Sequence, residues 1–281
     1  GCGNSALLGN LKSQGYTNLV GIDPAKNCAE RAKIYGIHDV NCGSIVDFDL
    51  SLVSDADVVL VMVVLEHLVT PKSSIDRLVG GMKVGARLII EVPSLKLFDG
   101  IKGEPLGELS IEHLQFFSLT SLTNLMVGLN LKLVGDYEME LPHALGALFA
   151  VFECTSEAAT EFQDASSDSV IMKKYVYDSN AKLTLCFEQP IDKSIILYGA
   201  GVHSARLLPQ LAERGIHVQA IVDGNPNYHG ETLGDIEIQH PMVLADMPDT
   251  PVLISSFRSE AAIKVFCTER FTNRLITFYG S

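Results

Sequence analysis

The chain opens on Gly1-Cys2-Gly3-Asn4-Ser5 and reaches Asn18-Leu19-Val20-Gly21-Ile22-Asp23 after one helix-length of sequence. Two glycines in a turn let the backbone approach a ligand closely, and the helix expected over residues 6–14 presents its N-terminal amides there. The second segment predicts a strand that ends on an acidic residue. In an α/β sheet this arrangement holds an adenosine-containing cofactor, with the carboxylate of Asp23 hydrogen-bonded to ribose hydroxyls.

Later segments extend this pattern to a parallel sheet. Residues 58–64 read VVLVMVV, an unbroken β-branched and apolar run that is typical of a strand buried on both faces. Residues 86–93, ARLIIEVP, predict a second buried strand after a helix and a glycine-rich turn. With a helix expected over 27–35 and a short strand near Val40, the alternation predicts an α/β fold.

Five pieces of sequence carry a resemblance to a known family. They are the GCGNS turn (1–5), the GID acid (21–23), VVLEHL (63–68) before Pro71, the glycine turn before LIIEVP (88–93), and IEHLQFFS (111–118). In this order they resemble the class I S-adenosylmethionine-dependent methyltransferases, and in particular bacterial sugar C-methyltransferases with a C-terminal Rossmann-like domain. The resemblance implies a Rossmann-like methyltransferase domain with S-adenosyl-L-methionine as the methyl donor.

The chain departs from the family pattern at its start. In that family an apolar strand at the centre of the sheet precedes the glycine turn, whereas this chain begins at the turn, and Ser5 stands where a third glycine is common. A missing central strand leaves the backbone groups of two neighbouring strands unpaired, which is costly when they are buried. We therefore expect the first strand to be missing because the sequence is incomplete at its N-terminus.

The donor site is predicted from the turn and from the residues that end three strands. The glycine turn and Asp23 hold the nucleoside, Ile22 and Pro24 flank the ribose, and the residues after the third and fourth strands border the adenine and methionine moieties. The cofactor-binding candidates are Gly1, Cys2, Gly3, Ile22, Asp23, Pro24, Ser44, Ile45, Val63 and Val64.

Two Glu-His pairs are candidates for acid–base chemistry. Glu112-His113 follows a loop rich in glycine and charge (99–108), and its EHLQFFS context resembles the sugar C-methyltransferases in which these two residues serve as acid–base groups. The alternative is that His113 packs against the sheet edge. His67, in the pair Glu66-His67 beyond the 58–64 strand, is the second catalytic candidate, although the pair could instead cap the following helix. His143 lies in a segment that could line the acceptor pocket or form a plain loop.

The chain is expected to divide into three parts. Residues 1–154 form the methyltransferase domain, 155–192 a polar linker and connecting helix, and 193–281 a smaller Rossmann-like α/β domain. The last part begins with a buried strand that turns at Gly199-Ala200-Gly201 into a helix, and the next strand ends on Asp223. This pattern fits an NAD(P) site, but Ser204 at the third glycine position and the short unit favour a plain strand-to-helix corner.

Three functions stay open on this evidence. The first is methyl transfer from S-adenosylmethionine to a small hydroxylated acceptor, for which the resemblance favours a nucleotide-linked sugar. The second is an NAD(P)-binding oxidoreductase that uses the C-terminal domain, and the third is a non-catalytic scaffold. Neither the acceptor nor the methylated atom, carbon, oxygen or nitrogen, can be read from the residues.

Composition limits the partners. A formal net charge of −13 argues against a nucleic-acid substrate, and the longest apolar run is far short of the roughly 20 residues that cross a bilayer. The six cysteines are scattered without a CxxC pair, so free thiols in a reducing cytoplasm are expected and no metal site is predicted. We expect a cytoplasmic, bacterial enzyme with a small-molecule substrate; the sequence does not reveal its oligomeric state.

Overall fold

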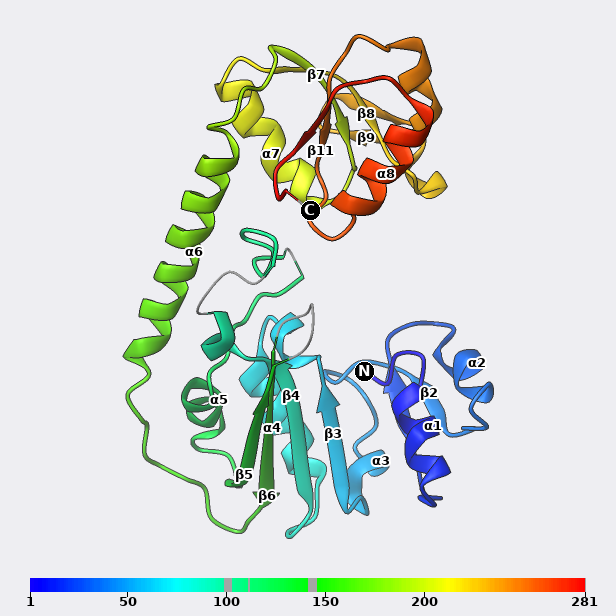
Figure 1. The fold of residues 1–281 in the computed structure, drawn as a ribbon. Helices are drawn as coiled ribbons and strands as arrows, with labels where there is room; N and C mark the ends of the chain where they lie inside the picture. Colours follow the sequence, from blue (N-terminus) through cyan, green and yellow to red (C-terminus); the bar gives the residue numbers. More distant parts are fainter. Residues whose placement is uncertain (99–102, 111, 141–145, 281) are drawn as a thin grey trace. The chain divides into compact units, whose positions relative to one another are not determined.

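The computed structural model describes residues 1–98, 103–110, 112–140 and 146–280. The chain forms two compact units, one of Gly1–Asp99 and Ile111–Lys174 and the other of Gly100–Ser110 and Tyr175–Ser281 (Figure 1). Helix α6 (Ser166–Cys186) carries the chain from the first unit into the second. The boundaries expected at residues 154 and 193 stay a prediction, and His143 lies outside the described residues.

The first unit is built on a four-stranded sheet. Its strand order is β3 (Val58–Met62), β4 (Arg87–Pro93), β6 (Ala147–Cys154) and β5 (Leu131–Met139). β3 and β4 are parallel, whereas β6 runs antiparallel to both of its neighbours. Alternate residues of β4 are buried, among them Leu88 and Ile90, as expected for a strand that packs on helices.

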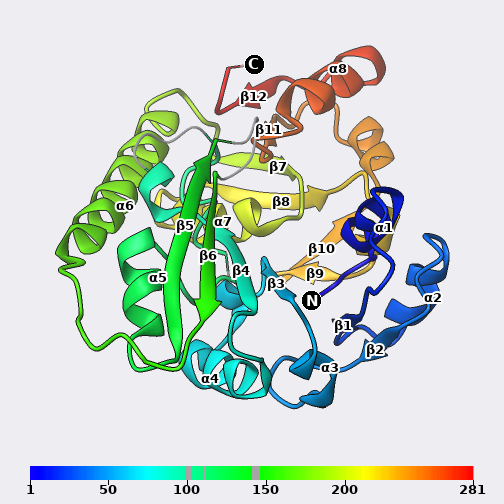
Figure 2. The same ribbon diagram turned by 90° about the horizontal axis from the view of Figure 1, so that it is seen from below.

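A separate pair of parallel strands, β1 (Gly21–Asp23) and β2 (Val40–Cys42), carries the glycine turn. Helices α1 (Ala6–Ser13) and α2 (Cys28–Lys33) accompany this pair, which lies on the β3 side of the larger sheet (Figure 2). No strand among the described residues joins β1 to β3, so these two strands lie in separate sheets. The side chains of Ile22, Ile45 and Val64 pack against the core of the larger sheet and connect the two.

The remaining elements of the first unit follow the expected order. They are α3 (Ser51–Ser54), the 3₁₀ turn η1 (Leu65–His67), α4 (Pro71–Gly81), the 3₁₀ turn η2 (Leu95–Phe98) and α5 (Leu119–Met126). Pro71 stands in the first turn of α4, where a missing N–H costs nothing. A capping box between Ser118 and Ser121 begins α5 and fixes where the 112–117 segment ends.

The second unit contains a six-stranded mixed sheet. The strand order is β12 (Leu275–Thr277), β11 (Val252–Ile254), β7 (Ser194–Tyr198), β8 (His217–Val222), β10 (Ile236–Gln239) and β9 (Thr232–Leu233), and only β9 is antiparallel. Its other elements are α7 (Val202–Glu213), α8 (Glu260–Arg270) and the 3₁₀ turns η3 (Pro226–Tyr228) and η4 (Pro241–Asp246). None of the helices in the described residues is long and apolar enough to cross a membrane.

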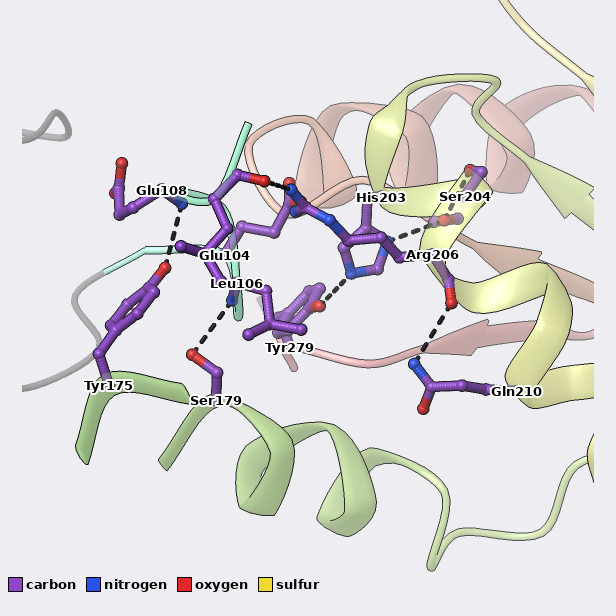
Figure 3. A network of polar contacts seen from close by, with 12 residues as sticks. Glu104, Leu106, Glu108, Tyr175, Ser179, His203, Ser204, Arg206, Gln210 and Tyr279 are labelled. Carbon is purple, nitrogen blue, oxygen red and sulfur yellow. Dashed lines mark hydrogen bonds and ion pairs between the residues drawn. The ribbon is translucent and has the colours of Figure 1, made fainter. Parts of the chain in front are cut away.

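Part of the loop after β4 belongs to this second unit. The amides of Leu106 and Glu108 donate to the hydroxyls of Ser179 and Tyr175 on α6, at 3.1 and 3.0 Å (Figure 3). Arg206 on α7 donates to the carbonyl of Leu109 and pairs with Glu104 (Figure 3). Residues 103–110 are therefore held by side chains that follow them by 67 to 102 positions in the chain.

Candidate active site

The glycine turn is closed by the acid that the sequence analysis selected. The amide of Gly3 donates to Oδ2 of Asp23 at 2.7 Å, and the amide of Ala25 donates to Oδ1 at 3.0 Å. The amide of Cys2 donates to the carbonyl of Ile22 at 2.8 Å. Because Gly3 has a φ of +55°, the turn needs a residue that tolerates left-handed backbone.

The end of β3 lies beside this turn, and Figure 1 shows the N-terminus near the tip of the β3 arrow. A Cβ atom on Gly1 would lie 3.3 Å from a methyl group of Val64 and 3.4 Å from Oδ2 of Asp23. A side chain at position 1 would therefore press against Val64 and the carboxylate of Asp23. The structure thus fits a nucleoside bound against the turn, which is the site predicted for the donor.

Val63, which directly follows β3, is strained. Its φ is +52°, and its amide donates to the carbonyl of Glu91 at 2.9 Å. A β-branched residue with positive φ is a genuine outlier, and such outliers cluster at functional sites. Sequence reasoning selected Val63 for its position after β3, but no sequence signal indicated its backbone conformation.

The other cofactor candidates surround the same strand ends. Pro24 is exposed and follows Asp23, while Ser44 and Ile45 are half-buried after β2. The amide of Ser44 donates to the carboxylate of Asp47 at 3.1 Å, and the amide of Gly43 donates to the carbonyl of Asp23 at 3.0 Å. All ten candidates therefore lie in the glycine turn or just at the ends of β1, β2 and β3; their contacts with a donor stay a prediction.

The two Glu-His pairs, far apart in the sequence, meet in space. The rings of His67 and His113 are 5.1 Å apart between centroids. Nδ1 of His67 lies 2.8 Å from the main-chain carbonyl of Glu112, which is 45 positions away in sequence. A carbonyl only accepts hydrogen bonds, so Nδ1 carries a hydrogen, and in the neutral ring Nε2 of His67 presents a lone pair.

Main-chain bonds hold the second pair in place. The amides of Leu114 and Gln115 both donate to the carbonyl of Glu66, at 2.8 and 3.0 Å. Phe117 bridges to Ser94 at the end of β4. The His67 side chain therefore bonds to the 112–115 segment, which is a different role from the helix cap that the sequence left open.

Glu66 is the residue whose importance the sequence analysis missed. Its side chain is 1% exposed, and neither carboxylate oxygen has a hydrogen-bond partner among the described residues. Nε2 of His67 lies 3.8 Å from Oε1 of Glu66. The Glu66-His67 pair just after β3 was the sequence signal for this position. The burial of the Glu66 carboxylate could not be predicted from that signal, because it depends on the fold.

Burial shifts the pKa values of Glu66, Glu91 and His113. Burial raises the pKa of the Glu66 carboxyl, and the charge of Glu91 acts in the same direction. Burial also raises the pKa of Glu91 itself. The pKa of His113 is lowered by burial and then by the neighbouring His67, which favours the neutral imidazole.

The glycine turn of the second unit has a different environment. The amide of Ala200 donates to Oδ2 of Asp223 at 2.7 Å, but a Cβ on Gly199 would lie only 2.7 Å from the carbonyl oxygen of Ser255. Beside it, Nδ1 of His203 is hydrogen-bonded to the hydroxyl of Ser255 in a buried cluster. The contacts favour the strand-to-helix corner over an NAD(P) site, which stays an untested alternative.

A family model supports the methyl-transfer part of the first of the three functions and identifies no acceptor. Residues 1–135 match the family described as a methyltransferase domain. No curated protein matches the chain. Solved structures that are similar to part of the chain include a methyltransferase from Methanosarcina mazei (15% identity, 56% of this chain and 91% of that chain, TM-score 0.44).

Two further similar structures have defined ligands. One is 1,6-didemethyltoxoflavin-N1-methyltransferase from Burkholderia thailandensis with its substrate and S-adenosylhomocysteine (16% identity, 56% and 69% coverage, TM-score 0.43). The other is the N-methyltransferase NodS from Bradyrhizobium japonicum with S-adenosylhomocysteine (17% identity, 56% and 76% coverage, TM-score 0.42). Residues 1–135 of this chain are a methyltransferase domain, and its methyl donor is S-adenosylmethionine.

Proposed function

We propose that this protein transfers the methyl group of S-adenosylmethionine to a small hydroxylated acceptor, with nucleotide-linked sugars as the favoured class. The preference for sugars comes from the resemblance of IEHLQFFS to bacterial sugar C-methyltransferases. The net charge of −13 supports a small acceptor over a nucleic acid.

One observation carries the proposal: two Glu-His pairs converge just beyond the strand whose end borders the glycine turn. Val64 lies against Gly1, and Glu66 and His67 follow Val64 directly. His113 joins them from the 112–115 segment. The proton acceptors His67 and His113 therefore lie close to the predicted donor site, because η1 follows Val64 directly.

The donor supplies a methyl group on a positively charged sulfur, and the acceptor attacks that carbon in line while the carbon–sulfur bond breaks. The glycine turn and Asp23 hold the nucleoside, and fixed positioning of two reactants contributes about 7–11 kcal/mol in well-oriented systems. His113 accepts the proton that the acceptor loses, which contributes about 10²–10⁴-fold. Glu112 orients His67 through its carbonyl, and a role for its carboxylate is part of the same proposal.

The test is product analysis by mass spectrometry. The protein is incubated with isotopically labelled S-adenosylmethionine and a panel of nucleotide sugars, together with small phenols and amines as other acceptor classes. We expect one labelled methyl group on a nucleotide sugar. Labelling of a phenol or amine alone would refute the sugar assignment, and the absence of transfer to any acceptor would count against methyl transfer to small molecules.

A further inference from the structure

We propose that Glu66, His67 and His113 together bind one divalent transition-metal ion. Each residue offers one ligand atom, and the three atoms lie within 4.8 Å of one another. Two imidazoles and one carboxylate are a donor set that such ions accept. No metal site could be predicted from the sequence, because the ligands come from two segments that are distant along the chain.

The arrangement of Glu66 and His67 favours a cation between Oε1 of Glu66 and Nε2 of His67. The Glu112 carbonyl accepts the hydrogen of Nδ1 of His67, so in the neutral ring Nε2 is an acceptor, and it faces Oε1 of Glu66 at 3.8 Å. Two acceptors cannot hydrogen-bond to each other. Typical Zn–N and Zn–O distances of about 2.0–2.2 Å allow one ion to reach both atoms across this gap.

The burial of Glu66 points to the same conclusion. Both of its carboxylate oxygens are buried without a hydrogen-bond partner among the described residues. An unpaired buried carboxylate is strongly unfavourable, and buried charges in proteins are paired or coordinate metals. The described residues place no lysine or arginine against Glu66, which leaves a bound proton or a bound cation as the compensation.

The surroundings of His67 are those of a metal ligand. A histidine that binds a metal usually donates its other ring N–H to a carbonyl or carboxylate, which fixes the tautomer and the ring orientation. The carbonyl of Glu112 does this at 2.8 Å. The two amides that donate to the carbonyl of Glu66 also tie the segment with His113 to the turn with the other two ligands.

The donor set indicates the class of ion. Imidazole nitrogens suit zinc, iron, copper and nickel ions, whereas Mg²⁺, Ca²⁺ and Mn²⁺ prefer oxygen ligands. Three protein ligands leave coordination positions open, and both histidines are partly exposed while Glu66 is buried behind them. An oxygen ligand from solution can therefore complete the shell.

This inference refines the proposed function at the same site. If the acceptor is a hydroxyl compound, which rests on the proposed function, its oxygen fits an open position on the ion. When the ion is bound, His113 acts through the ion, whereas the ion-free protein uses His113 as the proton acceptor. Ion binding, however, requires neither donor nor acceptor and can be tested without them.

The experiment uses tag-free protein that has been stripped with a chelator and titrated with Co²⁺. Visible d–d absorption reports coordination, and calorimetry with Zn²⁺ gives the stoichiometry. We expect one ion per chain. Glu66→Gln and His113→Asn should each weaken binding by more than the roughly 10–100-fold that loss of an outer-shell partner costs.

Matched variants separate ligation from folding. His38→Asn removes an exposed histidine outside the cluster and should bind one ion with unchanged affinity. Glu66→Gln keeps the side-chain shape, and its thermal unfolding is measured without metal. Absence of Co²⁺ binding by the parent protein, or equal affinity in folded Glu66→Gln and the parent, would overturn the proposal. Labelled methyl transfer that persists in chelated protein would leave the proposed function intact while denying the ion its role.

Discussion

Replacing Asp23 with asparagine tests the donor site most directly. Asp23 receives two backbone N–H groups, from Gly3 at 2.7 Å and Ala25 at 3.0 Å, on different oxygens. Asparagine has one oxygen, so one of these N–H groups must face its NH₂ group. Loss of a hydrogen bond to a charged group costs about 1.5–3 kcal/mol, and we expect Asp23→Asn to lower the free energy of unfolding by that amount.

Donor affinity should fall separately. The bond from a ribose hydroxyl to the carboxylate is charge-assisted and contributes about 1.5–3 kcal/mol, which corresponds to roughly 10- to 150-fold weaker binding. Calorimetry with S-adenosylhomocysteine measures this loss at a temperature at which chemical denaturation shows the variant to be folded. Asp49→Asn is the control, because Asp49 also accepts a backbone N–H, from Ser51 at 2.9 Å, but is exposed and lies outside the site. An affinity of Asp23→Asn within twofold of the parent protein would refute the assignment of Asp23 to the nucleoside.

Three further outcomes are expected. His113→Asn should lower kcat by about 10²–10⁴-fold in the labelled-methyl assay while the affinity for S-adenosylhomocysteine is retained, and unchanged turnover would exclude His113 from catalysis. Burial lowers the pKa of His203 to about 4, so its neutral form is favoured in the fold and stability falls as the pH drops from 6.5 towards 4. Between pH 7 and 5 the parent protein should lose about 2 kcal/mol more unfolding free energy than His203→Gln in urea titrations, and equal losses would contradict this assignment. Val63→Gly relieves left-handed strain of about 1–2 kcal/mol at an entropic cost of about 0.4–1 kcal/mol, so its unfolding free energy should be unchanged or up to about 1 kcal/mol higher. The buried control Val61→Gly should instead lose several kcal/mol, and a similar loss in Val63→Gly would show that Val63 is not strained.

The local parts of this site could be predicted because local sequence determines them. The helix after the glycine turn begins at Ala6 and ends at Ser13, within one residue of expectation, and the next strand ends at Asp23. The glycines allow the turn, the apolar residues favour the strand and the acid marks the end of that strand, and each of these effects acts within a few residues. The same holds for α5, where Ser118 supplies the cap that ends the preceding segment.

The meeting of the two Glu-His pairs could not be predicted in the same way. It depends on hydrogen bonds from the amides of Leu114 and Gln115 to the carbonyl of Glu66. Every residue type carries the same main-chain carbonyl, so the sequence does not indicate where such bonds form. The left-handed backbone of Val63 is also hidden, because valine favours extended conformations. Sequence therefore identified two separate candidate histidines, whereas the structure unites them with a third, buried ligand.

The two glycine turns of this chain show why such a motif alone does not define a ligand site. In both units a carboxylate at the end of the strand that follows the turn and its helix accepts an amide of the turn at 2.7 Å, from Gly3 to Asp23 and from Ala200 to Asp223. The surroundings differ. A Cβ on Gly199 would meet the carbonyl of Ser255 at 2.7 Å, so this glycine is needed for close packing of the backbone. At Gly3 a Cβ would meet nothing within 4 Å, and the same holds at Gly201 in the second turn, so neither of these two glycines is needed for close packing. Because the carbonyl of Ser255 packs against the second turn at Gly199, ligand titrations should place S-adenosylhomocysteine at the first turn and detect no NADH bound at the second; quenching of NADH fluorescence that disappears in Asp223→Ala would reverse this distinction.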